Sequence, residues 1–213
     1  MTNVSPLPGA PEASSPMSLP RWLLFAGISA LLLRGWLALA LPITGDEAYF
    51  YWWGVYPELG YYDHPPMVGW LIAAMRATLG DTLWSIRLPV LLLPIALGGM
   101  LWWALSAIDR TRAAWAVLLF WLAPINWLNV LITTDTPLIF WSVASACCLL
   151  VAERRPRLDG GTWGLYALSG GLLGAALLSK YFAVVLGFAY FMYFVLFRRD
   201  RLAAFAVLLL LIS

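Results

Sequence analysis

Long apolar runs, several of them separated by short groups of arginines, dominate the chain. The first run extends from Arg21 to Ile43 and is long enough to cross about 30 Å of hydrocarbon. The chain is 62% hydrophobic and only 11% charged, whereas soluble domains average roughly 25% charged residues. A soluble globule of 213 residues has too little interior to hide so much apolar surface. The sequence therefore predicts an all-α integral membrane protein.

Further apolar runs follow the first, and each is a candidate span. They cover residues 88–108, 113–133, 137–152, 162–179, 181–197 and 202–212. Residues 1–20 are rich in Pro, Ser and Ala, and we expect them to form a disordered tail. A signal peptide is the competing interpretation of the first run, because Ala38-Leu39-Ala40 resembles a cleavage site. A retained anchor is favoured, since Arg34 interrupts a run that is long for a signal.

Arginines gather in three loops, and these loops predict the orientation of the chain. The groups are Arg110 and Arg112; Arg154, Arg155 and Arg157; and Arg198, Arg199 and Arg201. Basic loops stay in the cytoplasm, so the three loops and the N-terminus are expected there. Counting the short run Pro66–Leu79 as a span would move every later arginine group outside. We therefore predict about seven spans and one large external loop, 44–87, that contains short interfacial helices.

Charge and cysteine content exclude two classes of function. Lys and Arg number 13 against 11 Asp and Glu, so no basic face for nucleic acid can be assembled. Cys147 and Cys148 are adjacent in an apolar run, a spacing that suits neither a disulfide framework nor a zinc site. Both are expected to be small packing residues.

Two acids lie where the first run leaves the membrane, in the segment Thr44-Gly45-Asp46-Glu47. Neighbouring residues on a helix are about 100° apart, so Asp46 and Glu47 cannot both face one site. One of them could act as a base while the other caps the helix or forms an ion pair. A purely structural role is also open, because the helix dipole favours an acid in the first turn.

A rigid turn in the external loop presents an acid and the only histidine of the chain. In Tyr61-Tyr62-Asp63-His64-Pro65-Pro66, the two prolines stiffen the chain and fix the start of the next helix. Such a turn suits phosphate or metal binding, although a polar loop histidine such as His64 is more often structural. The same loop is crowded with Tyr, Phe and Trp, which indicates an interfacial belt or a platform for a sugar ring.

Two more charged residues interrupt the apolar pattern further along the chain. Asp135 precedes Pro137 and could be a helix cap, or it could line a cavity at the membrane rim. Lys180 is the only lysine and lies in a nearly continuous apolar stretch. It needs a partner or an anionic ligand unless its amine extends to the headgroups.

The order of these motifs resembles the polytopic glycosyltransferases that use polyprenyl-phosphate sugars. Similar families are the protein mannosyltransferase-like proteins and the lipid A aminoarabinose transferases. The motifs are Gly-Asp-Glu after the first run, Tyr-Tyr-Asp-His-Pro-Pro, Arg87-Leu88-Pro89, Thr-Asp-Thr-Pro and Leu-Ser-Lys-Tyr. The resemblance covers about residues 21–200, and it implies that 21–213 is one membrane module.

The resemblance also implies partners and a location. The donor would be a polyprenyl-phosphate-linked sugar, and the acceptor a hydroxyl of a lipid, a glycan or a protein. Transfer would occur at the outer face of a bacterial inner membrane. A divalent metal ion is possible, with Asp63 as one ligand, and no other cofactor is expected.

Roles carry over residue by residue. Asp46 matches the essential acid of the family, which would be the catalytic base. The residues expected to bind substrate are Glu47, Asp63, His64, Asp135 and Lys180. Aminoarabinose transferases typically have Lys at the position of His64 and Arg at that of Tyr49. Both differences lower the positive charge available to a phosphate, and they favour another branch of the family.

Two other classes remain open from the sequence. A membrane transporter would also place charges at the rim of an apolar bundle, but it would normally show an internal repeat, and none is visible. The run 202–212 is too short to span comfortably, which predicts that the chain is the N-terminal part of a longer protein. A truncated, non-catalytic membrane protein is therefore the second alternative.

Overall fold

The computed structural model describes residues 21–124, 126 and 129–210, and every regular element there is a helix. This confirms the all-α prediction, while the predicted tail 1–20 lies outside the described residues. The elements are α1 (Arg21–Ala40), α2 (Gly45–Val55), α3 (Met67–Leu79), α4 (Leu83–Leu105), α5 (Arg110–Leu122), α7 (Asp135–Arg154), α8 (Gly160–Leu177), η1 (Tyr181–Ala183), α9 (Val184–Phe197), η2 (Arg199–Arg201) and α10 (Leu202–Leu210).

Within the described residues, two helices, α4 and α7, are long and apolar enough to cross a membrane. Leu24–Ala40 of α1 and α2 pass the same test as a pair, with a bend of 76° at the break between them. Helix α3 and the segment Tyr181–Phe197 are apolar but shorter. These helices agree with an integral membrane protein, and the count of seven spans stays a prediction.

Two helix boundaries differ more than the others from those predicted. Helix α4 begins at Leu83, because the side chains of Thr82 and Ser85 each bond the other's backbone N–H in a capping box. The predicted external loop 44–87 therefore ends inside α4. Helix α5 ends at Leu122, far short of residue 133, because the residue before Pro124 is pushed into an extended conformation.

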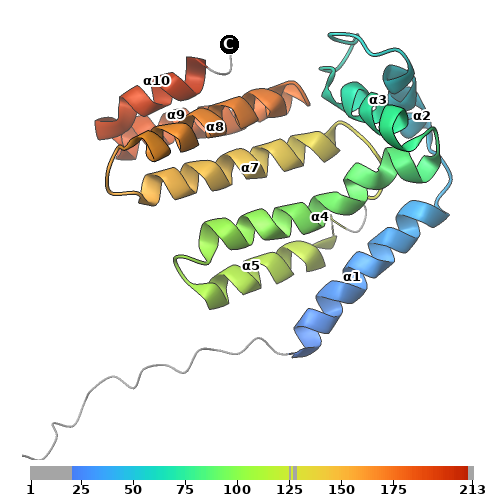
Figure 1. Ribbon diagram of the computed structural model, residues 1–213, viewed down its shortest axis with the longest axis horizontal. Coiled ribbons are helices and arrows are strands. Elements are labelled where there is room, and N and C mark those ends of the chain that lie inside the picture. The colour runs from blue at the N-terminus through green and yellow to red at the C-terminus, as the bar shows by residue number, and fades with distance from the viewer. Residues whose placement is uncertain (1–20, 125, 127–128, 211–213) are drawn as a thin grey trace, which may run out of the picture.

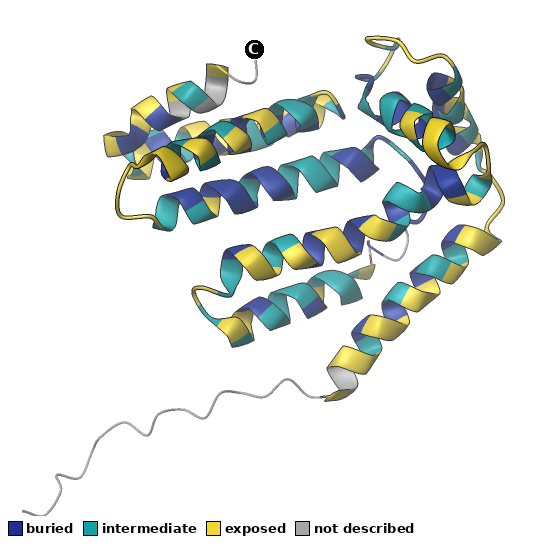
Figure 2. Cartoon of the chain, in the orientation of Figure 1, coloured by how far each residue is buried: buried dark blue, intermediate teal, exposed yellow. Residues whose placement is uncertain are grey.

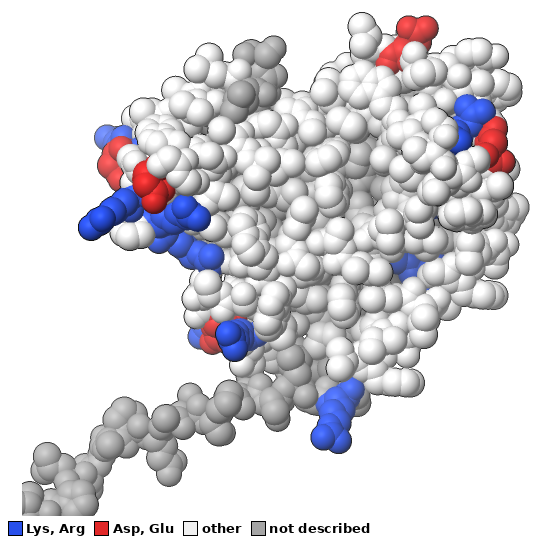
Figure 3. Space-filling model, in the orientation of Figure 1, with Lys and Arg blue, Asp and Glu red and all other residues white. Residues whose placement is uncertain are grey.

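The helices α4, α5, α7, α8 and α9 run side by side, and their connections alternate between two ends of the molecule (Figure 1). The three turns that carry the arginine groups lie at one end, where Figure 3 shows charge gathering beside an almost uncharged face. There Arg154 donates to the carbonyl of Ala104, and Arg201 donates to the carbonyl of Arg155 at 2.7 Å. The loops predicted to share one side of the membrane therefore share one end of the bundle.

A nearly buried carboxylate holds the helices together at this arginine-rich end. Glu153 has only 8% of its side chain exposed and accepts hydrogen bonds from Tyr193 at 2.9 Å and Arg198 at 2.6 Å. It also accepts from the hydroxyl of Tyr166. These contacts join α7, α8 and α9 at their ends.

Helix α7 is the centre of the bundle and packs against α8 on one side and α4 on the other. Buried residues recur along most of its length, whereas α1 is largely exposed (Figure 2). The hydroxyl of Ser145 donates to the carbonyl of Ser169 at 2.7 Å and lies 3.0 Å from the hydroxyl of Tyr190. Hydrogen bonds of this kind help to hold helices together in a membrane, because apolar side chains contact lipid tails as favourably as they contact another helix.

A buried arginine joins α1 to α4. Arg34 is 3% exposed and donates from Nε and Nη2 to the carbonyl of Val90, at 3.3 and 3.0 Å. That carbonyl has no helical donor, because the residue one turn later is Pro94, which lacks an N–H. Arg34 therefore replaces the hydrogen bond that the proline removes.

This pairing predicts the outcome of a double-mutant cycle. Arg34→Leu should lower stability by about 1–3 kcal/mol, because it leaves the Val90 carbonyl unpaired. Adding Pro94→Ala supplies a backbone N–H to that carbonyl, so the second change should recover part of the loss. Thermal unfolding in detergent measures both effects. Strictly additive changes in the double variant would show that the two residues do not share this carbonyl.

Candidate active site

The first turn of α2 presents Asp46 to solvent. Thr44 caps the helix, since its hydroxyl accepts from the N–H of Glu47 at 3.4 Å and its own N–H donates to the Glu47 carboxylate. Asp46 is exposed, and within the described residues its carboxylate has no hydrogen-bond or ion-pair partner. It is therefore free to accept a proton from a ligand.

Its neighbour Glu47 lies in the opposite environment, in a fully buried ion pair with Arg87. Both side chains are 0% exposed. Arg87 Nε donates to Oε1 of Glu47 at 2.8 Å, and its Nη2 donates to Oε2. The backbone N–H of Ile132 donates to the same Oε1 at 3.0 Å. Both carboxylate oxygens are thus occupied by the protein.

The remaining donors of Arg87 hold the end of α1. Nη1 donates to the carbonyls of Ala38 and Leu41, both at 2.7 Å, and Nη2 donates to that of Pro42 at 3.0 Å. The final carbonyls of a helix have no partner within it. All five N–H donors of the guanidinium are therefore used, and α1, α2 and α4 meet on one side chain.

Glu47 is predicted to bind substrate, and in this structure protein donors occupy both of its carboxylate oxygens. A substrate oxygen would have to displace Arg87 or the Ile132 amide to reach its carboxylate. No role for Arg87 follows from the sequence alone, although a charged residue directly before Leu88-Pro89 and an apolar run needs a partner. That need was the one available signal, and it does not identify the partner.

The predicted pair Asp63 and His64 lies beside α2. The hydroxyl of Tyr49 donates to Asp63 at 3.3 Å, and Nδ1 of His64 lies 3.6 Å from the Asp63 carboxylate. The imidazole faces the rings of Phe50 and Trp53, with ring centroids 6.1 and 6.2 Å away. The His64 and Asp63 side chains are 29% and 43% exposed, so both remain accessible to a ligand.

Asp135 and Lys180 form an ion pair, with Nζ 2.8 Å from Oδ1. Asp135 is the first residue of α7, and Lys180 follows the end of α8. Their side chains are 48% and 29% exposed, so the pair is open to solvent on one side. The ammonium group also lies 5.9 Å from the centroid of the Phe182 ring.

Backbone contacts bring these segments to the same end of the molecule. The N–H of Met67, at the start of α3, donates to the carbonyl of Leu178 at 3.0 Å, close to Lys180. The bond from Ile132 to Glu47 brings the segment before Asp135 to the start of α2. Among the described residues, no hydrogen bond or ion pair links Asp46 directly to His64 or to Lys180.

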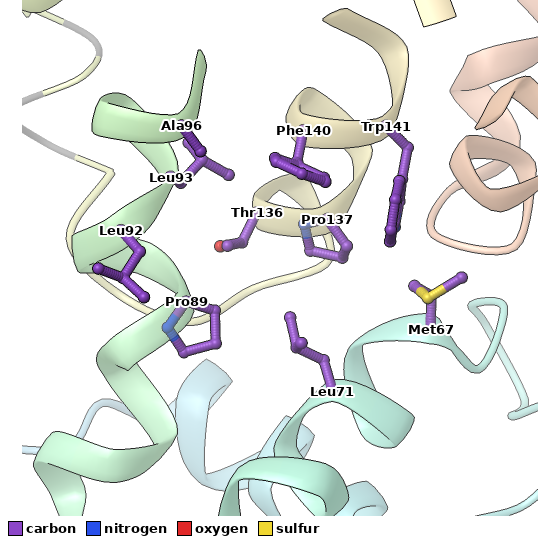
Figure 4. Close-up of a pocket in the computed structure, with 10 residues that line it drawn as sticks. All are labelled: Met67, Leu71, Pro89, Leu92, Leu93, Ala96, Thr136, Pro137, Phe140 and Trp141. Atoms are coloured by element: carbon purple, nitrogen blue, oxygen red, sulfur yellow. The ribbon is translucent and has the colours of Figure 1, made fainter. Parts of the chain in front are cut away.

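An apolar recess lies at this end between α3, α4 and α7, with a volume of about 260 Å³ (Figure 4). Side chains from all three helices face the shared space, and they include Met67, Leu71, Pro89, Leu93, Pro137 and Trp141. Thr136 also lines the recess and directly follows Asp135. The recess therefore adjoins the Asp135–Lys180 pair.

The aromatic loop divides into a packed part and an exposed part. Trp53 stacks on Tyr61, with centroids 4.1 Å apart and planes within 2°. The Tyr61 hydroxyl lies 2.8 Å from the carbonyl of Trp53 and fixes the loop against α2. Trp52 and Tyr56 instead point outward, with 57% and 66% of their surface exposed. The packed rings of Trp53 and Tyr61 are structural. For the exposed rings of Trp52 and Tyr56, an interfacial belt and a platform for a sugar ring both stay predictions.

Asp81, another exposed acid near α2, takes part in a surface network instead of the candidate site. Asp81 accepts from Arg76 at 2.8 Å and from the hydroxyl of Tyr51 at 2.7 Å, which joins α2 to the end of α3. The hydrogen bond from Arg76 holds the pKa of Asp81 below its ordinary value. The Asp81 carboxylate therefore contributes to stability at pH values above its pKa in the unfolded chain. This contribution is lost as the pH falls through the lower pKa that Asp81 has in the folded protein.

In the part of the chain that the structure describes, no group of three or more His, Cys, Asp or Glu side chains is placed to hold a metal ion. A divalent ion at Asp63 would need further ligands from outside the described set.

Loss of charge at the two neighbouring acids of α2 should lower the stability of the protein by very different amounts. Glu47→Gln should lower stability by about 3–5 kcal/mol, because it leaves Arg87 as an uncompensated buried cation. Asp46→Asn is the matched control and should cost about 1 kcal/mol or less, since Asp46 is exposed and unpaired. Thermal unfolding of both variants in the same detergent tests this. Equal stability of the two variants would contradict the structural role of Glu47.

Comparison with known proteins identifies the family of this chain. No curated protein and no solved structure matches the chain. A family model described as dolichyl-phosphate-mannose-protein mannosyltransferase matches residues 63–213. The match includes Asp63, His64, Asp135 and Lys180, and it begins after Asp46 and Glu47. Because this match covers most of the chain, the protein belongs to the dolichyl-phosphate-mannose-protein mannosyltransferase family.

Proposed function

We propose that the protein transfers a sugar from a polyprenyl-phosphate donor to an acceptor hydroxyl, at the end of the bundle that holds α2 and α3. Membership of the family implies a glycosyltransferase that uses such a donor. The observation that carries the assignment to this end is the contrast between Asp46 and Glu47. One acid is free and exposed, and the other is fixed within the fold.

Asp46 is the proposed base. Its carboxylate accepts the proton of the acceptor hydroxyl while the hydroxyl oxygen bonds to the anomeric carbon of the donor sugar. The bond from that carbon to the phosphate oxygen breaks, and the polyprenyl phosphate leaves with the electron pair. General base catalysis of this kind contributes about 10²–10⁴ in rate. The Glu47–Arg87 pair positions Asp46 by fixing the first turn of α2.

His64 and Lys180 are the proposed phosphate-binding groups. Both are partly exposed, and a departing phosphate is stabilised by donors already in place. Asp135 holds the Lys180 ammonium in position before the donor arrives. Asp63 positions the sugar or the acceptor, and it would be a ligand of a divalent ion if one takes part.

The recess between α3, α4 and α7 is the proposed location for the first part of the polyprenyl chain. Its lining is apolar and includes Thr136, which directly follows Asp135, the ion-pair partner of Lys180. A donor with a charged head and an isoprenoid tail needs this combination, because the tail has to stay in apolar surroundings while the head needs a cation. The recess supports a lipid-linked donor over a soluble sugar nucleotide.

The remaining parts of the proposal concern topology and acceptor. The arginine-rich end is assigned to the cytoplasm, so the site faces outward in a bacterial inner membrane. The complete module is proposed to have seven spans, with α2 and α3 in the first external loop. The acceptor is a hydroxyl of a lipid, a glycan or a protein.

Loss of the Asp46 carboxylate should strongly reduce sugar transfer while the protein stays folded. In the whole protein, Asp46→Asn should lower the transfer of labelled sugar from polyprenyl phosphate by about 10²–10⁴. The control is Asp81→Asn, which removes another exposed external acid that lies in the surface network. Transfer at the normal rate by the Asp46 variant would remove it as the base, whereas equal losses in both variants would indicate a general effect of charge.

Labelling of single cysteines tests the assignment of sides. Cys147→Ala and Cys148→Ala remove the two native thiols, which are free and buried. Cysteine is then placed at position 81 or at position 110. An impermeant maleimide applied to intact cells should label position 81 only, and position 110 should react only after the membrane is opened. Labelling of both positions from one side would contradict the proposed topology.

A further inference from the structure

A second groove lies away from the candidate active site, between α1, α4 and α5. Its volume is about 370 Å³, within the range of about 300–1,000 Å³ typical of ligand pockets. The lining includes Arg21, Leu24, Gly99, Trp102, Val117 and Trp121. All but Arg21 are apolar or small, so the groove offers an apolar channel with one cation.

The shape of the groove is fixed by the packing of Trp121 against Gly98 and Gly27, and by the open space beside Gly99. Trp121 donates from its indole to the carbonyl of Pro94 at 2.9 Å, and its ring packs against Gly98. Close contact of α1 with α5 is made at Gly27, where a Cβ would lie 3.2 Å from the Trp121 ring. At Gly99 a Cβ would meet no atom within 4 Å. Gly99 therefore leaves open space that a larger side chain would fill.

Arg21 supplies the charge of the groove. It is the first residue of α1, at the end of that helix opposite to α2. Its side chain is exposed, and within the described residues no carboxylate pairs with it. A guanidinium binds a phosphate oxygen well, because its fork of donors matches the geometry of the anion.

We propose that this groove binds one anionic phospholipid, with an acyl chain between Gly99 and Trp102 and the phosphate at Arg21. Lipid is the solvent of apolar helix faces in a membrane protein, which sets the class of the occupant. The unpaired guanidinium at the groove selects a negative headgroup from that solvent. This site is independent of the proposed glycosyl transfer, and it would bind lipid from the leaflet opposite to the α2–α3 end.

Native mass spectrometry of the full chain tests the site by counting lipids retained in mild detergent. Phosphatidylglycerol and phosphatidylcholine with the same acyl chains serve as probes. The unmodified protein should retain one phosphatidylglycerol, with about tenfold preference over phosphatidylcholine. Arg21→Gln should remove that preference and keep weak binding of both lipids. Arg21→Lys, which preserves the charge, should retain most of it.

Filling the groove should remove the lipid altogether. Gly99→Leu places a side chain in the open space and should lower retention of both lipids about tenfold. The matched control is Gly171→Leu in α8, where a Cβ also meets no atom within 4 Å but which does not line the groove. Equal retention of the two lipids by the unmodified protein would overturn the proposal, and so would unchanged retention in Gly99→Leu. Circular dichroism confirms that each variant is folded.

Discussion

The buried ion pair between Arg87 and Glu47 is the interaction on which this end of the molecule depends. It neutralises two charges that could not otherwise remain at 0% exposure in an apolar bundle. Its guanidinium also binds the carbonyls of Ala38, Leu41 and Pro42, at the sharp bend between α1 and α2. The amide of Ile132 adds the segment before α7 to the same cluster.

The location of this pair explains why two adjacent acids have different properties. A helix turns by about 100° per residue, so fixing Glu47 inward sets the direction of Asp46 outward. The proposed base is thus held by a neighbour whose carboxylate is bound by Arg87 and by the Ile132 amide. Holding a catalytic group this way lowers the reorganisation needed during reaction, which is where much of the catalytic advantage arises. The Asp135–Lys180 pair would act in the same way in the proposed mechanism, since it orients a cation before the phosphate of the donor binds.

Much of the fold could be predicted because charges are costly in lipid and therefore rare. Asp46, Asp63, His64, Asp135 and Lys180 stand out for that reason, and the structure brings them to one end. The partners could not be predicted, since Glu47 and Arg87 are 40 positions apart and sequence spacing says nothing about contacts at that range. The short α5 was missed because hydropathy continued past Pro124, whereas backbone geometry did not.

The three-way junction at Arg87 also constrains how the chain is assembled during synthesis. When only α1 and α2 have been synthesised, Glu47 has no counter-ion, and the carbonyls that Arg87 binds at the end of α1 lack this donor. Arg87 supplies the counter-ion and the donors once α4 has been synthesised, and the amide of Ile132 adds its hydrogen bond to Glu47 later. The amino-terminal third of the chain therefore reaches its final geometry after α4 is in place, and a stalled nascent chain ending before residue 87 would expose an unpaired acid to quality-control proteases.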